Sequence, residues 1–141
     1  MKLDDETHAE VERLSELGNA ALDDFDNPRL AIRHWNEALA LLPDPKSDWE
    51  AATWLHASIG EGYFALGEFD EAEQSFRDAY ACPGGIENPL IPLRIGQCAF
   101  ELERPQDARE FLLRAYMLEG DDIFEDEDEK YFSFLRSEVE L

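Results

Sequence analysis

Residues 59–84, with the sequence IGEGYFALGEFDEAEQSFRDAYACPG, decide the fold of this chain. Counted from Gly60, alanines stand at offsets 12 and 19, and the large Phe76 stands at offset 16. Gly or Ala at such fixed points lets two antiparallel helices approach closely. We expect the large residue to fill the gap between neighbouring helix pairs. The stretch therefore predicts a helix–turn–helix unit.

The same spacing occurs in two more places. A later copy begins at Gly96, 36 residues after Gly60, and keeps the offsets 12, 16 and 19 with Ala108, Leu112 and Ala115. An earlier copy begins at Gly18, and one extra residue near Asp26-Asn27-Pro28 precedes its Ala31, Trp35 and Ala38. Repetition of one unit at a fixed period predicts a stack of helix pairs.

This period and pattern resemble the tetratricopeptide repeat (TPR), a helical hairpin of about 34 residues that stacks into a superhelix. The resemblance implies an all-α, right-handed superhelix of three hairpins in one domain over residues 1–141. Its repeats span about 11–43, 53–84 and 89–120, and an acidic linker and capping helix follow at 121–141. Two positions depart from the pattern, because Phe25 and Glu103 stand where a turn glycine is expected.

Capping signals predict seven helices, at about 4–24, 28–41, 48–66, 70–81, 89–102, 105–118 and 129–140. Asparagine before proline is a good N-cap before a first helical residue, and a Ser-x-x-Glu pattern is a capping box. The chain shows these signals at Asn27-Pro28, Ser47-Asp48-Trp49-Glu50, Asn88-Pro89 and Pro105. The last predicted helix is expected to cover the apolar end of the stack.

The chain carries 34 acids and 12 bases, a net charge of −22. Such a chain repels phosphate backbones and anionic membrane surfaces, so neither nucleic acid nor membrane is expected as a partner. A basic protein or peptide is expected instead. Residues 1–27 and 121–141 each hold nine acids and two bases, which either keeps the ends of the stack solvated or attracts that basic partner.

The sequence predicts neither an enzyme nor a cofactor or metal site. The motifs HExxH, GxxxxGK[ST], GxSxG and GxGxxG do not occur. His8, His34 and His56 fall on separate predicted helices, without a His or Cys three or four residues on, so zinc is not expected. Two cysteines, Cys82 and Cys98, and a start without a targeting segment predict a cytoplasmic protein with free thiols.

The TPR resemblance implies a concave groove lined by the first helix of each hairpin. At 100° per residue, offsets of −6, −3, +1, +4 and +5 from each repeat glycine fall on one stripe. From this stripe we predict a partner-binding groove made of Asn19, Asp23, Trp54, Glu61, Phe64, Leu93, Gln97, Phe100 and Glu101. The stripe holds acids and aromatics but no base, so we expect it to bind an apolar segment that carries Lys or Arg.

Two alternatives concern this groove. Family members that grip acidic chaperone tails use Lys and Arg at such positions, so a chaperone-tail adaptor is not expected here. The first or last helix can instead cover some of the aromatics, which would then bind nothing.

Binding rather than catalysis is the expected activity. The chain resembles small stand-alone bacterial TPR proteins with an acidic carboxy-terminal end, some of which are immunity partners of polymorphic toxins. The resemblance implies an inhibitor that neutralises a basic, toxin-like protein, and an acidic binder associates quickly with such a partner. The alternative is a non-inhibitory adaptor or secretion chaperone for a basic client. In either role we expect the isolated chain to be monomeric or weakly self-associating.

Overall fold

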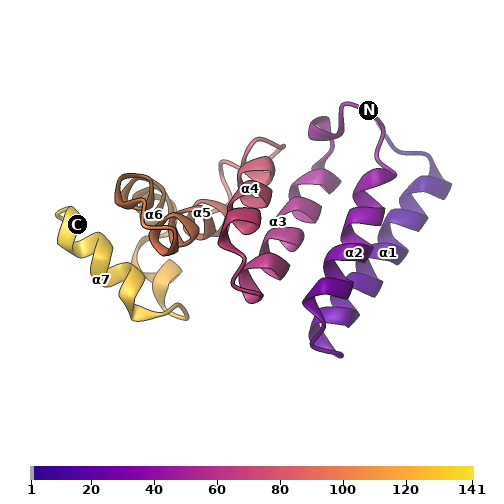
Figure 1. Ribbon diagram of the computed structural model, residues 1–141. Helices are drawn as coiled ribbons and strands as arrows, with labels where there is room; N and C mark the ends of the chain where they lie inside the picture. Colours follow the sequence, from indigo (N-terminus) through magenta and orange to yellow (C-terminus); the bar gives the residue numbers. More distant parts are fainter. Residues whose placement is uncertain (1) are drawn as a thin grey trace.

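The computed structural model describes residues 2–141, which form helices and turns without a strand (Figure 1). The helices are α1 (Asp5–Asp23), α2 (Pro28–Ala40), η1 (Lys46–Asp48), α3 (Glu50–Ala65), α4 (Phe69–Tyr80), α5 (Leu90–Glu101), α6 (Pro105–Glu119), η2 (Gly120–Phe124) and α7 (Glu129–Glu138). The predicted all-α class and the seven α-helices are confirmed. The short 3-10 helices η1 and η2 were not predicted.

Three antiparallel hairpins, α1/α2, α3/α4 and α5/α6, follow one another along the stack, and α7 lies at its far end (Figure 1). Within each hairpin the repeat glycine faces the large residue of the second helix. A Cβ on Gly60 would lie 2.8 Å from the Phe76 ring, and one on Gly96 would lie 2.7 Å from Leu112. The large residues thus face the glycine of their own hairpin. Trp35 and Phe76 also share apolar clusters with α3 and α5 of the next hairpin, as expected.

The turn inside each hairpin needs a residue in the left-handed backbone region. Gly67 takes this conformation in the second hairpin, with φ of 73°, and Glu103 takes it in the third, with φ of 59°. In the first hairpin it is Asp26, with φ of 48°, and not the expected Phe25. The extra residue in this turn moves the position by one, and Phe25 is left 73% exposed.

Most predicted helix starts are confirmed. The Asn27 side chain accepts a hydrogen bond from the Leu30 N–H, and Pro105 is the first residue of α6. The predicted capping box at 47–50 is wrong. Ser47 lies inside η1, and α3 begins at Glu50 after Trp49, without a side-chain cap.

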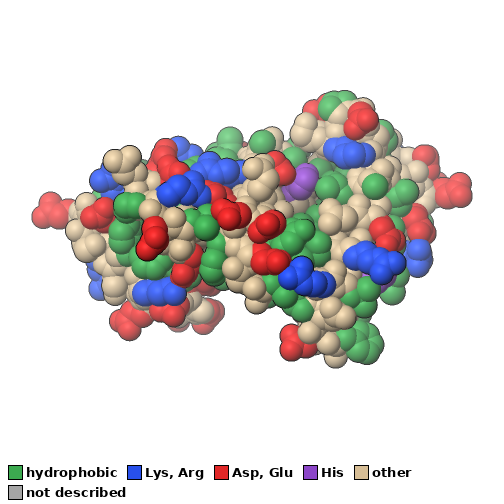
Figure 2. All heavy atoms as spheres, viewed as in Figure 1, with side chains coloured by type: hydrophobic (Ala, Val, Ile, Leu, Met, Phe, Trp, Pro, Cys, Tyr) green, Lys and Arg blue, Asp and Glu red, His purple; other side chains and the backbone are tan. Residues whose placement is uncertain are grey.

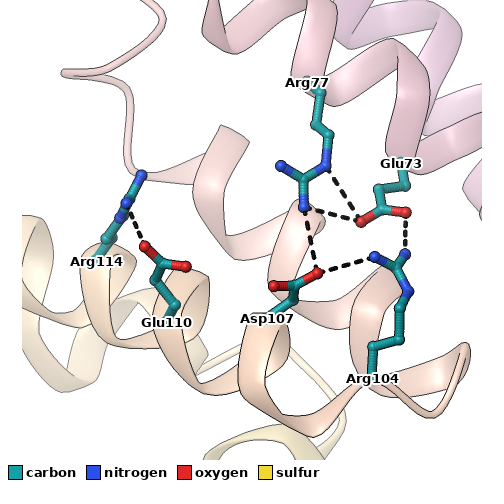
Figure 3. Close-up of polar contacts among 6 residues, drawn as sticks. All are labelled: Glu73, Arg77, Arg104, Asp107, Glu110 and Arg114. Atoms are coloured by element: carbon teal, nitrogen blue, oxygen red, sulfur yellow. Dashed lines mark hydrogen bonds and ion pairs between the residues drawn. The ribbon is translucent and has the colours of Figure 1, made fainter.

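Ion pairs join the second and third hairpins through their second helices (Figure 3). The buried carboxylate of Glu73 on α4 binds both Arg77 and Arg104. Asp107 on α6 completes the ring, 2.9 Å from Arg104 and 3.8 Å from Arg77. Arg77 and Arg114 also lie against the Phe111 ring, at 4.8 and 4.6 Å from its centroid. The contact between the second and third hairpins therefore combines ion pairs with apolar packing.

The surface charges are mixed on the face shown in Figure 2. Lys and Arg side chains alternate with Asp and Glu, and hydrophobic side chains lie between them. Across residues 2–141, no helix combines the length and the apolar character that crossing a bilayer requires.

Candidate protein-binding groove

The C-terminal segment, residues 120–138, covers the predicted groove at the third hairpin. Leu93 and Gln97 on α5 are both 0% exposed. Leu93 packs in one apolar cluster with Phe124 of η2 and with Tyr131 and Leu135 of α7. Ala57 and Glu61, which occupy the same offsets on α3, remain partly exposed. The groove is therefore closed at the third hairpin and open at the second.

Arg94 lies at the centre of this closed part. Its Nε lies 2.6 Å from Glu61 Oε1, its Nη1 lies 2.5 Å from Glu127 Oε1, and the Gln97 amide also donates to Glu127 at 2.8 Å. The guanidinium lies 4.9 Å from the centroid of the Phe64 ring. Burial alone would lower the pKa of Arg94, but hydrogen bonds and charge from Glu61 and Glu127 outweigh it and raise the pKa. Arg94 thus neutralises Glu61, an acid on a predicted stripe that contains no base of its own.

Phe100 and Glu101 are engaged by α7. The Phe100 ring meets Tyr131 and Phe134 edge to face, at 5.4 and 5.3 Å between centroids. Glu101 accepts a hydrogen bond from the Tyr131 hydroxyl at 2.9 Å and pairs with Lys130 at 2.6 Å. The aromatic residue on this part of the stripe is therefore covered by the last helix, as one of the two alternatives anticipated.

The remaining predicted residues lie on the open part of the face. Asn19 and Asp23 on α1 are exposed, and Glu61 and Phe64 on α3 are half-buried. Trp54 is 43% exposed, which is unusual for so large a ring. The structure thus covers the four predicted residues on α5, leaves those on α1 and Trp54 accessible, and holds Glu61 and Phe64 half-buried against Arg94. Their part in binding stays a prediction.

Two pockets lie on either side of Trp54. One, of about 520 Å³, lies between α1 and the start of α3 and is lined by Val11, Trp49 and a group of charged side chains. The other, of about 310 Å³, lies between α3 and the start of α5, beside Pro83 and Ile91. Trp54 therefore stands on a ridge between two hollows, an arrangement suited to holding side chains of a partner.

Sequence reasoning missed Trp49 as a groove residue. Its indole Nε1 donates to the Pro43 carbonyl at 2.9 Å, which fixes the ring in the lining of the larger pocket. Trp49 precedes α3 because η1 ends at Asp48. A stripe counted along one regular helix cannot include a residue in the bend before that helix.

One group of side chains bears on catalysis. His56 and Cys82 both lie near Asp78. Burial lowers the pKa of His56 and raises that of the Cys82 thiol, so neither the imidazolium nor the thiolate is favoured. Nucleophilic catalysis by cysteine needs the opposite shifts. In the described part of the chain, His, Cys, Asp and Glu form no group of three or more with the geometry of a metal site.

Comparison with known proteins supports the fold. No protein-family profile matches the chain. Outer dynein arm-docking complex subunit 4 of Danio rerio is 31% identical over 134 residues, which cover 90% of this chain and 26% of that protein. The chain therefore spans about a quarter of that relative's length. That this chain comes from a bacterium stays a prediction.

Solved structures, at lower identity, show the fold. The Arabidopsis OM64 TPR domain matches with a TM-score of 0.73 and 21% identity, covering 94% of this chain and 99% of its own. The Yersinia enterocolitica type III secretion chaperone SycD, in complex with a peptide of the translocator YopD, matches with a TM-score of 0.71 and 18% identity, covering 90% of each chain. The first TPR domain of Spaghetti (RPAP3), bound to an HSP90 peptide, matches with a TM-score of 0.70 and 21% identity, covering 92% of this chain and 90% of its own. The fold is TPR-like.

Proposed function

We propose that this chain is a protein-binding module whose open face, formed by α1 and α3, docks a basic and partly apolar segment of another protein. The observation that carries the proposal is the exposed Trp54 between two pockets. Aromatic anchors that fill or border pockets supply most of the binding energy in protein interfaces. A net charge of −22 favours a basic partner and accelerates its approach.

The ion pairs argue against an acidic tail as the ligand. Arg94 contacts the groove residues Glu61 and Phe64, and Glu61 and Glu127 already bind its guanidinium. An acidic peptide would have to displace these carboxylates. The sequence predicted that the chain is not a chaperone-tail adaptor because the stripe contains no base. The structure supports the same prediction for another reason, since Arg94 is present but already paired.

Two roles fit this binding activity. An immunity-type inhibitor that neutralises a basic, toxin-like protein is favoured by the high negative charge, because fast association suits such a role. A non-inhibitory adaptor or secretion chaperone for a basic client is favoured by the solved structures, since SycD is a secretion chaperone held with a translocator peptide. We propose the inhibitor as the first candidate and the adaptor as the second, both in the cytoplasm.

The test begins with capture of partners from the source organism by the tagged chain. Association and dissociation rates are then measured at two salt concentrations for Trp54→Ala and for Met117→Ala, a matched control that removes a side chain 77% exposed on α6. We expect Trp54→Ala to weaken binding by about 2 kcal/mol or more and the control to change it by less than about 0.5 kcal/mol.

The identity and activity of the partner separate the outcomes. A captured partner that is acidic, or one that binds the Trp54→Ala chain as well as the original, contradicts the proposal. Loss of the partner's own activity in the complex supports the inhibitor. A partner that stays active and better dispersed in the complex supports the adaptor.

A further inference from the structure

The larger pocket beside Trp54 is built from two tryptophans and an apolar base. Val11 on α1 is buried beneath it, and Trp49 and Trp54 form its α3 side. The hydrogen bond from the Trp49 indole to Pro43 holds that ring in place. A volume of about 520 Å³ accommodates long side chains of a partner rather than a backbone alone.

Four carboxylates surround this pocket, and they belong to Asp5, Glu12, Asp48 and Glu50. Within residues 2–141, none of the four pairs with a lysine or arginine, and the contact at Glu12 is with His8 at 3.1 Å. The acids around Arg94 differ, because Glu61 and Glu127 already bind that guanidinium. The pocket therefore has negative charge that no lysine or arginine of the described residues binds in an ion pair.

Tryptophan rings and carboxylates together select one kind of side chain. A lysine or arginine has an aliphatic stem that packs on apolar surface, and its cationic end is attracted to the face of a tryptophan and to carboxylates. Lys2 also borders the pocket, so four acids face one strong base there. Charge complementarity thus favours a cationic side chain over a neutral apolar one.

We propose that this pocket binds a lysine or arginine side chain of the protein partner, with its stem against Trp54 and its charge among the four carboxylates. The inference rests on the proposed function and adds where the partner's cation is held. A second copy of the chain is a poorer occupant, since two chains of net charge −22 repel each other.

The probe is an acetylated and amidated pentapeptide, Ala-Leu-Lys-Leu-Ala, compared with the same peptide carrying Gln instead of Lys. Binding is followed through the three tryptophan indole N–H signals in ¹H–¹⁵N spectra. Trp35, 2% exposed in the first hairpin, serves as the internal control. We expect the Lys peptide to shift the signals of Trp54 and Trp49 but not that of Trp35, and the Gln peptide to bind at least about three-fold more weakly.

Paired variants test the carboxylates. Glu12→Gln with Glu50→Gln removes two charges at the pocket, whereas Glu119→Gln with Glu140→Gln removes two exposed charges at the other end of the stack. We expect the first pair to weaken binding of the Lys peptide by about three- to ten-fold and the second pair by less than two-fold, because distant exposed charges are screened. All four sites are exposed, so folding is retained and checked by circular dichroism.

Three outcomes overturn the inference: equal binding of the Gln peptide, equal effects of the two variant pairs, or no shift of Trp54 with millimolar Lys peptide. A captured basic partner can bind the Glu12/Glu50 variant with unchanged affinity but bind Trp54→Ala more weakly. That result overturns the cation pocket and leaves the proposed function standing. Capture of only acidic partners overturns the proposed function. The titrations with the Lys and Gln peptides then still show whether the pocket binds a cationic side chain.

Discussion

Replacing Glu103 by glycine is expected to stabilise this protein, although the substitution removes a whole side chain. Glu103 lies in the turn of the third hairpin with φ of 59°, a region that costs a non-glycine residue about 1–2 kcal/mol. Glycine reaches this region without that cost but loses about 0.5–1 kcal/mol more conformational entropy on folding. The free energy of unfolding should therefore rise by about 0.5–1 kcal/mol.

Gly67 provides the matched opposite change. It occupies the same turn in the second hairpin, where its N–H donates to Phe64 O at 3.0 Å, as that of Glu103 donates to Phe100 O at 3.1 Å. A Cβ on Gly67 would meet no atom within 4 Å, so Gly67→Ala tests backbone conformation alone. It should lower the free energy of unfolding by about 0.5–1 kcal/mol.

Urea unfolding followed by far-ultraviolet circular dichroism measures both changes, as shifts in midpoint at constant slope. Glu103→Ala is the control, since it removes the same carboxylate but keeps a Cβ in the left-handed turn. Its midpoint should stay near that of the original chain. If Glu103→Gly is no more stable than Glu103→Ala, the left-handed turn carries no cost and the reasoning is refuted.

Three further perturbations test the packing and the pH response. Gly60→Ala should cost about 1–2 kcal/mol, because overpacking against Phe76 outweighs the gain in helix propensity, and a thermal midpoint that rises instead would contradict the hairpin packing. Leu135→Ala should cost about 2–3 kcal/mol, since this side chain of α7 is 0% exposed; the exposed Ser133→Ala is its control, and equal thermal midpoints for the two would show that α7 is no cap. Burial lowers the pKa of His56 in the folded chain. The contribution of neutral His56 to the free energy of unfolding should therefore be complete above about pH 6.5, and it should fall as pH drops through the lowered folded pKa. Between pH 7 and 5, the urea midpoint of His56→Gln should fall less than that of the original chain. If the midpoints of both chains fall equally with pH, His56 is not the source of this pH dependence.

The fold could be predicted because its determinants are local. Glycine and alanine spacing fixes where helices approach, and Asn27 and Pro105 mark helix starts through groups within three residues of themselves. The errors are also local in origin. Ser47 lies in a 3-10 turn that competes with the capping pattern, and the extra turn residue transfers the left-handed position from Phe25 to Asp26.

The site could be predicted only in part, because its electrostatics depend on contacts distant in sequence. Arg94 stands at offset −2 from Gly96, outside the stripe, yet its long side chain reaches Glu61 on the neighbouring hairpin. Glu127 comes from an acidic segment that was expected to solvate the end of the stack or to attract a basic partner, and the structure brings it to Arg94 and Gln97. Helical periodicity locates a side chain on a face but does not determine which charges meet there.

These pairings divide the chain's negative charge into two kinds. Acids such as Glu61, Glu101 and Glu127 are bound to Arg94 or Lys130, and a partner's cation would have to compete with those bonds. The acids around the Trp54 pocket have no such bond, so they can exchange water for a cation at lower cost. All exposed acids contribute to attraction at a distance, but only the second kind favours the final position of the partner. The basic part of a partner should therefore be held at the N-terminal end of the stack, although residues 121–141 are just as rich in acids.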